Sequence, residues 1–183
     1  MTVIFSNVQD DDCITLQNLW RDIPNVKVIE LTPNSTDWEQ SVDDAIAAEN
    51  DTLILAGHGT TQGLLAPCLY NGEYVIHQNN VGLIHAKNVF CMWCYASTFC
   101  RDNKLHSFST SMFISNTGEA WACNGRCLQS QEDINNLSRK FCLEVRQLIL
   151  ENTPLDQWQM ILGAKMDAEN EIDTYNRQGL YYL

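Results

Sequence analysis

The sequence has no long apolar run and little positive charge. No segment approaches the roughly 18 consecutive apolar residues that a membrane-spanning helix needs, so we expect no membrane partner. Lysine and arginine number 11 against 23 aspartates and glutamates, which gives a formal net charge of −12. This charge repels phosphate backbones and argues against a nucleic-acid partner, whereas a basic substrate would be attracted. The same charge also fits simple solubilisation of a cytosolic protein.

The amino terminus lacks both the basic segment and the apolar segment of an export signal. We therefore expect a cytoplasmic protein whose eight cysteines are reduced, several of them as small core residues. Cys123 and Cys127 bracket a turn and either close a disulfide or remain free, and a reducing compartment favours free thiols.

The composition is that of an ordinary globular protein, with 45 % apolar and 19 % charged residues in 183. The sequence has neither internal repeats nor a linker, and its length allows a sizeable core. A single domain over residues 1–183 is therefore predicted.

Apolar segments alternate with amphipathic ones in the first part of the chain. Short apolar strands are predicted at 2–6, 26–31 and 52–58, with helices between them. The second helix is expected to begin with a capping box formed by Thr36 and Glu39. This β-α-β-α-β order predicts a parallel sheet covered by helices.

The pattern changes after residue 58. Residues 59–81, which include Asn71 and Gly72, indicate a β-hairpin rather than a crossover helix. The other predicted elements are a short helix at 81–86, strands at 88–94, 108–115 and 179–183, a short helix capped by Ser97 and ending at Leu105, a loop at 116–126, and helices starting at Ser130 and Pro154.

Two of the predicted strands end on chemically reactive side chains. The strand 52–58 ends at His58, and the strand 88–94 ends at Cys94. Parallel strands carry both residues to the carboxyl edge of the sheet, where sites in open α/β folds lie. His85 and His106 precede their strands and should lie at the opposite edge, and His77 lies in the hairpin. His58 is therefore the candidate base.

Cys94 is the cysteine that this base would serve. Cys91 lies within the same strand and should be inert packing. The amino terminus of the helix after Cys94 would favour its thiolate. The backbone amides of Gly59 and Cys94 would form an oxyanion hole, since a glycine allows close approach of a substrate carbonyl.

Cysteine spacing also suggests two other kinds of site. Cys91 and Cys94 form a Cys-x-x-Cys, and Cys123 with Cys127 supplies a second pair that could bind zinc. Residues i and i+3 of a strand point to opposite faces, so this geometry argues against a metal site. A thioredoxin-type motif requires both cysteines at a helix start, which Cys91 does not satisfy. We expect neither a metal nor a cofactor.

The two strand ends resemble those of the caspase-like cysteine peptidases (clan CD), and are closest in pattern to CHAT and clostripain-type domains. The matching segments are 53–59, Leu-Ile-Leu-Ala-Gly-His-Gly, and 89–97, Val-Phe-Cys-Met-Trp-Cys-Tyr-Ala-Ser. The order of elements downstream to residue 183 is also similar. The resemblance implies a three-layer α-β-α sandwich around a mostly parallel sheet of about six strands.

The resemblance also implies a cysteine endopeptidase acting on a peptide or protein substrate. His58 would be the general base and acid, Cys94 the nucleophile, and the amides of Gly59 and Cys94 the oxyanion hole. Many relatives carry an acidic residue just before the cysteine for a basic P1 side chain, but Met92 and Trp93 stand here.

Asp10, Asp11 and Asp12 follow the first strand. They are the candidates for an acidic substrate pocket, although solvated acids at a helix start are the simpler interpretation.

The alternative function is a caspase-like binding or signalling module without catalysis. Retention of both His58 and Cys94 argues against it.

Overall fold

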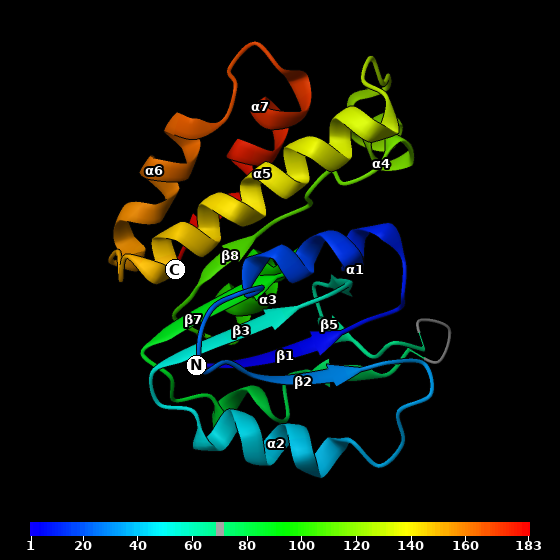
Figure 1. The fold of residues 1–183 in the computed structure, drawn as a ribbon. Coiled ribbons are helices and arrows are strands. Elements are labelled where there is room, and N and C mark those ends of the chain that lie inside the picture. Colours follow the sequence, from blue (N-terminus) through cyan, green and yellow to red (C-terminus); the bar gives the residue numbers. More distant parts are fainter. Residues whose placement is uncertain (69–71) are drawn as a thin grey trace.

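A six-stranded sheet forms the centre of the molecule (Figure 1), in a computed structural model that describes residues 1–68 and 72–183. The strand order is β2-β1-β3-β7-β8-β9; the first five are parallel, and β9 is antiparallel to β8. The strands are Thr2–Ser6 (β1), Lys27–Leu31 (β2), Thr52–Ala56 (β3), Asn88–Met92 (β7), Phe108–Thr110 (β8) and Leu180–Tyr182 (β9). The prediction of an α/β fold with a mostly parallel sheet of about six strands is confirmed.

Helices cover both faces of this sheet, an arrangement compatible with three layers (Figure 1). They are Asp11–Leu16 (α1), Glu39–Ala48 (α2), Ala96–Asp102 (α3), Thr117–Asn124 (α4), Gln131–Leu150 (α5), Trp158–Lys165 (α6) and Glu171–Gln178 (α7). In the part of the chain that the structure describes, no helix is both long and apolar enough to span a membrane.

Alternate residues of the central strands pack into two separate cores. Leu55 of β3 and Cys91 of β7 face the core built with α2 and α3. Their neighbours Ala56 and Met92 face the opposite core, which α1, α5 and α6 complete. Because side chains alternate between the faces of a strand, the last residues of β3 and β7, Ala56 and Met92, both face the α1 and α5 side.

The helix α5 follows directly from its sequence. Ser130 accepts a hydrogen bond from the Asp133 amide, and the Asp133 carboxylate accepts bonds from the Ser130 amide and hydroxyl, so the capping box is complete. Phe141 and Val145 lie four residues apart on its buried face. The predicted start at Ser130 is confirmed.

The segment after β3 forms a small antiparallel sheet instead of a crossover helix. Gly59–Thr60 (β4), Gly63–Leu65 (β5) and Tyr74–Ile76 (β6) pair in that order. The hairpin prediction is confirmed for the described strands, whereas Asn71 of the predicted turn lies outside the described residues. The short helix expected next is a single 3-10 turn at Val81–Leu83.

Two predicted helix caps are wrong because a residue with positive φ intervenes. Asp37 has φ +53°, which prevents a helix from running on from Thr36, and α2 begins only at Glu39. Tyr95 has φ +67° and is the cap residue of α3, so Ser97 lies inside the helix and is buried.

The segment 116–126 was predicted as a loop and is mostly the helix α4. The Asn116 side chain accepts a hydrogen bond from the Glu119 amide at the start of this helix, and Gly125, at φ +68°, ends it. Asparagine and glycine therefore act here as caps rather than as loop residues. The strand β8 correspondingly ends at Thr110 and not at Ser115.

The small sheet depends on the absence of a side chain at Gly59. A Cβ at this position would lie 2.0 Å from Cδ1 of Trp93 and 2.7 Å from the Gly63 carbonyl oxygen. We predict that Gly59→Ala lowers the free energy of unfolding by about 1–3 kcal/mol, because the buried indole must shift. Urea denaturation measures this change. Gly82→Ala is the matched control, since a Cβ there meets nothing within 4 Å; equal stability of both variants would contradict the packing argument.

Candidate active site

The register of the two central strands places His58 and Cys94 at equivalent positions. Ala56 of β3 is paired with Met92 of β7, and His58 and Cys94 each follow two residues later. Both strands are parallel, so both residues lie beyond the carboxyl edge of the sheet and toward the α1 and α5 face.

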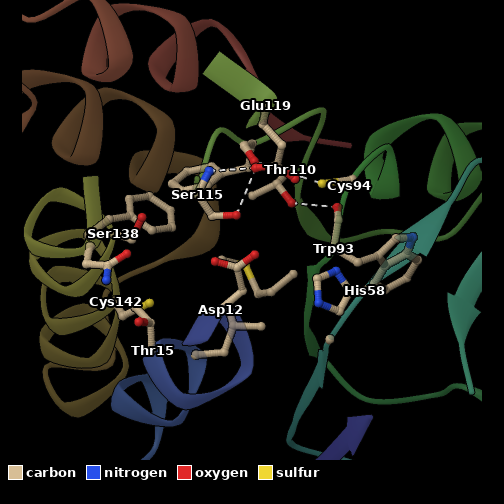
Figure 2. A pocket seen from close by; sticks show the side chains of 16 residues that line it. Asp12, Thr15, His58, Trp93, Cys94, Thr110, Ser115, Glu119, Ser138 and Cys142 are labelled. Carbon is tan, nitrogen blue, oxygen red and sulfur yellow. Dashed lines mark hydrogen bonds between the residues drawn. The ribbon is translucent and has the colours of Figure 1, made fainter. Parts of the chain in front are cut away.

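His58 and Cys94 line the same cavity, which has a volume of about 70 Å³ (Figure 2). Its walls come from α1, the ends of β3 and β7, the segment after β8, and the helices α4 and α5. Most of the exposed surface inside it is apolar, including Phe113 and Phe141. A cavity of this size accommodates one small group or one side chain rather than a whole drug-sized ligand.

Asp10 holds the imidazole of His58. The distance between Nε2 of His58 and Oδ2 of Asp10 is 2.7 Å, and the two side chains are 28 % and 43 % exposed. The other Asp10 oxygen accepts a hydrogen bond of 2.9 Å from the Cys13 amide at the start of α1. Burial opposes ionisation of Asp10, but the Cys13 amide and His58 outweigh it and lower the pKa of Asp10. Asp10 is thus a charged partner that fixes the orientation of His58.

The Cys94 thiol is partly buried and does not contact His58 within hydrogen-bonding distance in the described structure. Its Sγ donates to the Phe113 carbonyl oxygen at 3.9 Å. Burial, together with the negative charges of Glu119 and Asp12, raises the pKa of Cys94 to about 11. This direction is opposite to the thiolate stabilisation expected from the start of α3. Cys94 is therefore a neutral thiol at pH 7 in the free protein.

Two acidic side chains line the cavity beside Cys94. Asp12 lies on α1, and Glu119 on α4 accepts hydrogen bonds from the amide and hydroxyl of Ser115 at 2.7 and 2.9 Å. Among the described residues that line the cavity there is neither lysine nor arginine. Of the three aspartates singled out in the sequence, Asp12 lines the cavity, Asp10 binds His58, and Asp11 is exposed and outside the lining.

A polar group on α5 also faces this acidic cavity. The Ser138 side chain lines it, and Ser138 is only 7 % exposed. Within the described part of the chain, its hydroxyl has no hydrogen-bond partner. A buried hydroxyl without a partner carries a desolvation cost, which a polar group entering the cavity would offset.

Gly59 follows the cavity-lining His58 directly in the chain but serves a different contact. It begins β4, its Cα packs against the Trp93 ring, and it is not among the described lining residues. The Trp93 indole donates to the Thr60 carbonyl oxygen at 3.2 Å, which fixes the ring over this glycine. The close packing of Trp93 thus explains why a residue without a side chain is needed at position 59. The Cys94 amide, in contrast, has no hydrogen-bond acceptor among the described residues.

His85, His106 and Cys91 lie outside the described lining of the cavity, as the strand ends indicated, whereas Cys142 of α5 lines it. His85 is exposed before β7, and Nδ1 of His106 donates to the Leu183 carbonyl oxygen at 2.8 Å. Cys91 is fully buried inside β7. Of the two alternatives left open for Cys123 and Cys127, the structure has two free thiols.

Sequence reasoning missed both Ser138 and Glu119 as site residues, and it missed Glu119 because its segment was interpreted as a loop. The spacing of Asn116 and Glu119 is that of a helix cap followed by an acid at the third helical position. This signal was sufficient to predict α4, although not the contact of Glu119 with the cavity.

The raised pKa of Cys94 predicts slow alkylation at neutral pH. The rate of iodoacetamide modification of Cys94 should rise about tenfold per pH unit between roughly pH 7 and 9, because only the thiolate reacts. Glu119→Gln should accelerate it roughly threefold at about pH 8, since loss of a neighbouring negative charge lowers the pKa. Mass spectrometry of the Cys94 peptide gives the rates. The control is Glu132→Gln on the exposed side of α5; equal rates in all three proteins would disprove the electrostatic account.

Comparison with known proteins gives no family assignment. No protein-family model, no curated protein and no solved structure matches the chain. What the protein does must therefore be argued from its own residues and their geometry.

Proposed function

We propose that this protein is a cysteine endopeptidase with a caspase-like fold. The observation that carries the proposal is the placement of His58 and Cys94 at register-equivalent positions beyond two adjacent parallel strands, lining one cavity. The hydrogen bond that Nε2 of His58 donates to the Asp10 carboxylate supports the proposal, because a neutral thiol requires an oriented base.

The reaction begins with the thiol still protonated. When a peptide enters, Cys94 leaves its weak bond to the Phe113 carbonyl, and His58 takes the thiol proton as Sγ attacks the scissile carbonyl carbon. Catalytic hydrogen bonds are often long in free enzymes and shorten in the substrate complex. The carbonyl oxygen becomes an oxyanion, and we assign the Cys94 amide, which has no acceptor among the described residues, as its donor.

The second half of the reaction uses the same groups. Collapse of the oxyanion breaks the C–N bond, and His58 returns its proton to the leaving amine. Water then attacks the thioester, with His58 accepting a proton from it, and the carboxylic acid product leaves with Cys94 again a thiol. The Asp10 carboxylate stays hydrogen-bonded to the imidazole during both proton transfers.

The acidic cavity favours a basic P1 side chain. Asp12 and Glu119 supply negative charge without a basic partner in the described lining, and Phe113 and Phe141 contact an aliphatic stem. A lysine or arginine placed there would also offset the two charges that raise the pKa of Cys94. Binding of the correct substrate would thus assist ionisation of the nucleophile.

A catalytically inactive binding module is the second candidate function. It is favoured by the high pKa of Cys94 and by the lack of a bond from its thiol to His58 in the described structure. Such a module would bind a basic segment in the same cavity without cleaving it. Covalent labelling separates the two candidates.

Peptide acyloxymethyl ketones test the nucleophile. A probe with lysine or arginine at P1 should label Cys94, because the attacking thiolate displaces the carboxylate leaving group, and Cys94→Ala should abolish the label. Cys68→Ser is the matched control, since Cys68 is exposed and outside the cavity. The adduct is located by mass spectrometry. Labelling at Cys68, or no labelling with basic, acidic or neutral P1 probes, would reject the peptidase.

Substitution of Asp12 tests the P1 preference. Asp12→Asn should lower kcat/KM for a P1 arginine peptide roughly tenfold, through loss of one charged contact, and should change cleavage of a P1 norleucine peptide much less. Asp11→Asn is the control, because Asp11 is exposed and outside the lining. Fluorogenic peptides provide the rates. Equal losses for both peptides would show that Asp12 does not contact P1.

A further inference from the structure

A second set of reactive side chains meets on the other side of His58. Oδ of Asp10, Sγ of Cys13 and Nε2 of His58 all lie within 4.8 Å of one another. Asp10 and Cys13 come from the start of α1, which follows β1, and His58 follows β3. Among the described residues this is the only cluster of three metal-ligating side chains at such distances.

The fold holds these three groups together through short local contacts. β1 and β3 are adjacent and parallel, with Phe5 paired to Ala56, so the chain leaves both strands at the same edge. Asp10 caps α1 and accepts from the Cys13 amide, which places the cysteine one turn away from the carboxylate. Gly57 permits the close approach, since a Cβ there would lie 2.6 Å from the Ser6 carbonyl oxygen.

The three donors also differ in accessibility in a way that suits a bound ion. Cys13 is fully buried, and its thiol donates a weak hydrogen bond to the Ser6 carbonyl oxygen at 3.6 Å. The side chains of His58 and Asp10 are partly exposed, which leaves an entry path from solvent. The cluster is therefore closed on the sulfur side and open on the carboxylate and imidazole side.

The donor set selects a metal of intermediate softness. One thiolate, one imidazole and one carboxylate are typical zinc ligands, whereas calcium and magnesium prefer oxygen alone. Three protein ligands leave a fourth tetrahedral position for water. The sequence suggested a metal only at the Cys91–Cys94 and Cys123–Cys127 pairs, and strand geometry argued against it there; Cys91 is buried on the α3 side of the sheet.

We propose that Asp10, Cys13 and His58 bind one Zn²⁺, with water as the fourth ligand. Binding replaces the Asp10–His58 hydrogen bond with two metal bonds: Nε2 loses the proton of that hydrogen bond to solvent while Nδ1 takes one up, and the Cys13 proton is released to solvent as the thiolate forms. The donors already lie within 4.8 Å of one another. A tetrahedral zinc ion spaces its ligand atoms about 3.3–3.6 Å apart, so Nε2 of His58 and Oδ2 of Asp10, now 2.7 Å apart, must separate by roughly 0.6 Å to admit it.

A regulatory consequence rests on the proposed peptidase. Zinc on Nε2 of His58 leaves the imidazole with its proton on Nδ1, so the ring can no longer accept the proton of Cys94. Zinc should thus suppress reaction at Cys94 without binding to Cys94 itself. The metal site would act as a reversible inhibitor site that shares the base with the active site.

Cobalt absorption tests the metal site without reference to activity. The intact chain, stripped with EDTA and titrated with Co²⁺, should develop a thiolate-to-cobalt charge-transfer band and tetrahedral d–d bands at one equivalent, both removed by Zn²⁺. Cys13→Ser should lose the charge-transfer band, and His58→Gln should weaken binding at least tenfold. Cys123→Ser and Cys68→Ser are the controls that should retain it.

The outcomes separate this proposal from the peptidase. Because Cys13→Ser alters a buried position, circular dichroism must show a folded protein; if it is unfolded, His58→Gln decides. An unchanged cobalt spectrum in His58→Gln, or no spectrum in the unmodified chain, overturns the metal site. In the peptidase assay, Zn²⁺ should reduce Cys94 labelling in the unmodified protein and not in Cys13→Ser. A cobalt site without labelling would preserve the metal proposal and reject the peptidase.

Discussion

The pairing of Ala56 with Met92 is the constraint on which the candidate site depends. A shift of one residue between β3 and β7 would send either His58 or Cys94 to the opposite face of the sheet. The register is fixed by the alternation of the two strands, whose buried side chains must fill one core with α2 and α3 and another with α1 and α5. The requirements of packing therefore also align the two reactive groups.

Burial opposes ionisation of the Cys94 thiol, and the two neighbouring carboxylates indicate what would favour it. Apolar walls and two carboxylates keep Cys94 a thiol in the free protein. The site thus differs from cysteine sites that hold a thiolate next to a cation at rest. A substrate that brings positive charge between Asp12 and Glu119 would change this balance, and one without it would leave the thiol protonated. The net charge of −12 fits the attraction of such a substrate.

Helices and strands with a regular spacing of apolar residues could be predicted from the sequence. Element boundaries that depend on the backbone conformation of a single residue could not. The strands β3 and β7 follow from apolar runs, although they end at Ala56 and Met92, two residues before the predicted ends at His58 and Cys94. The start of α5 follows from Ser130 and its capping box. The start of α3 depends on the left-handed Tyr95, which no period reveals. Gly59 was interpreted as an opening for substrate, although its small size is needed by Trp93, a contact between residues 34 positions apart.

The central claim is that Cys94 and His58 act together on a carbonyl held in one cavity. A crystal structure of the chain after reaction with a ketone bearing lysine at P1 tests it most directly. The account predicts a bond from the Cys94 sulfur to the inhibitor, His58 within hydrogen-bonding reach of the adduct, and the P1 ammonium between Asp12 and Glu119. An adduct on another cysteine, or a Cys94 adduct with His58 out of reach and the P1 side chain in solvent, would contradict it.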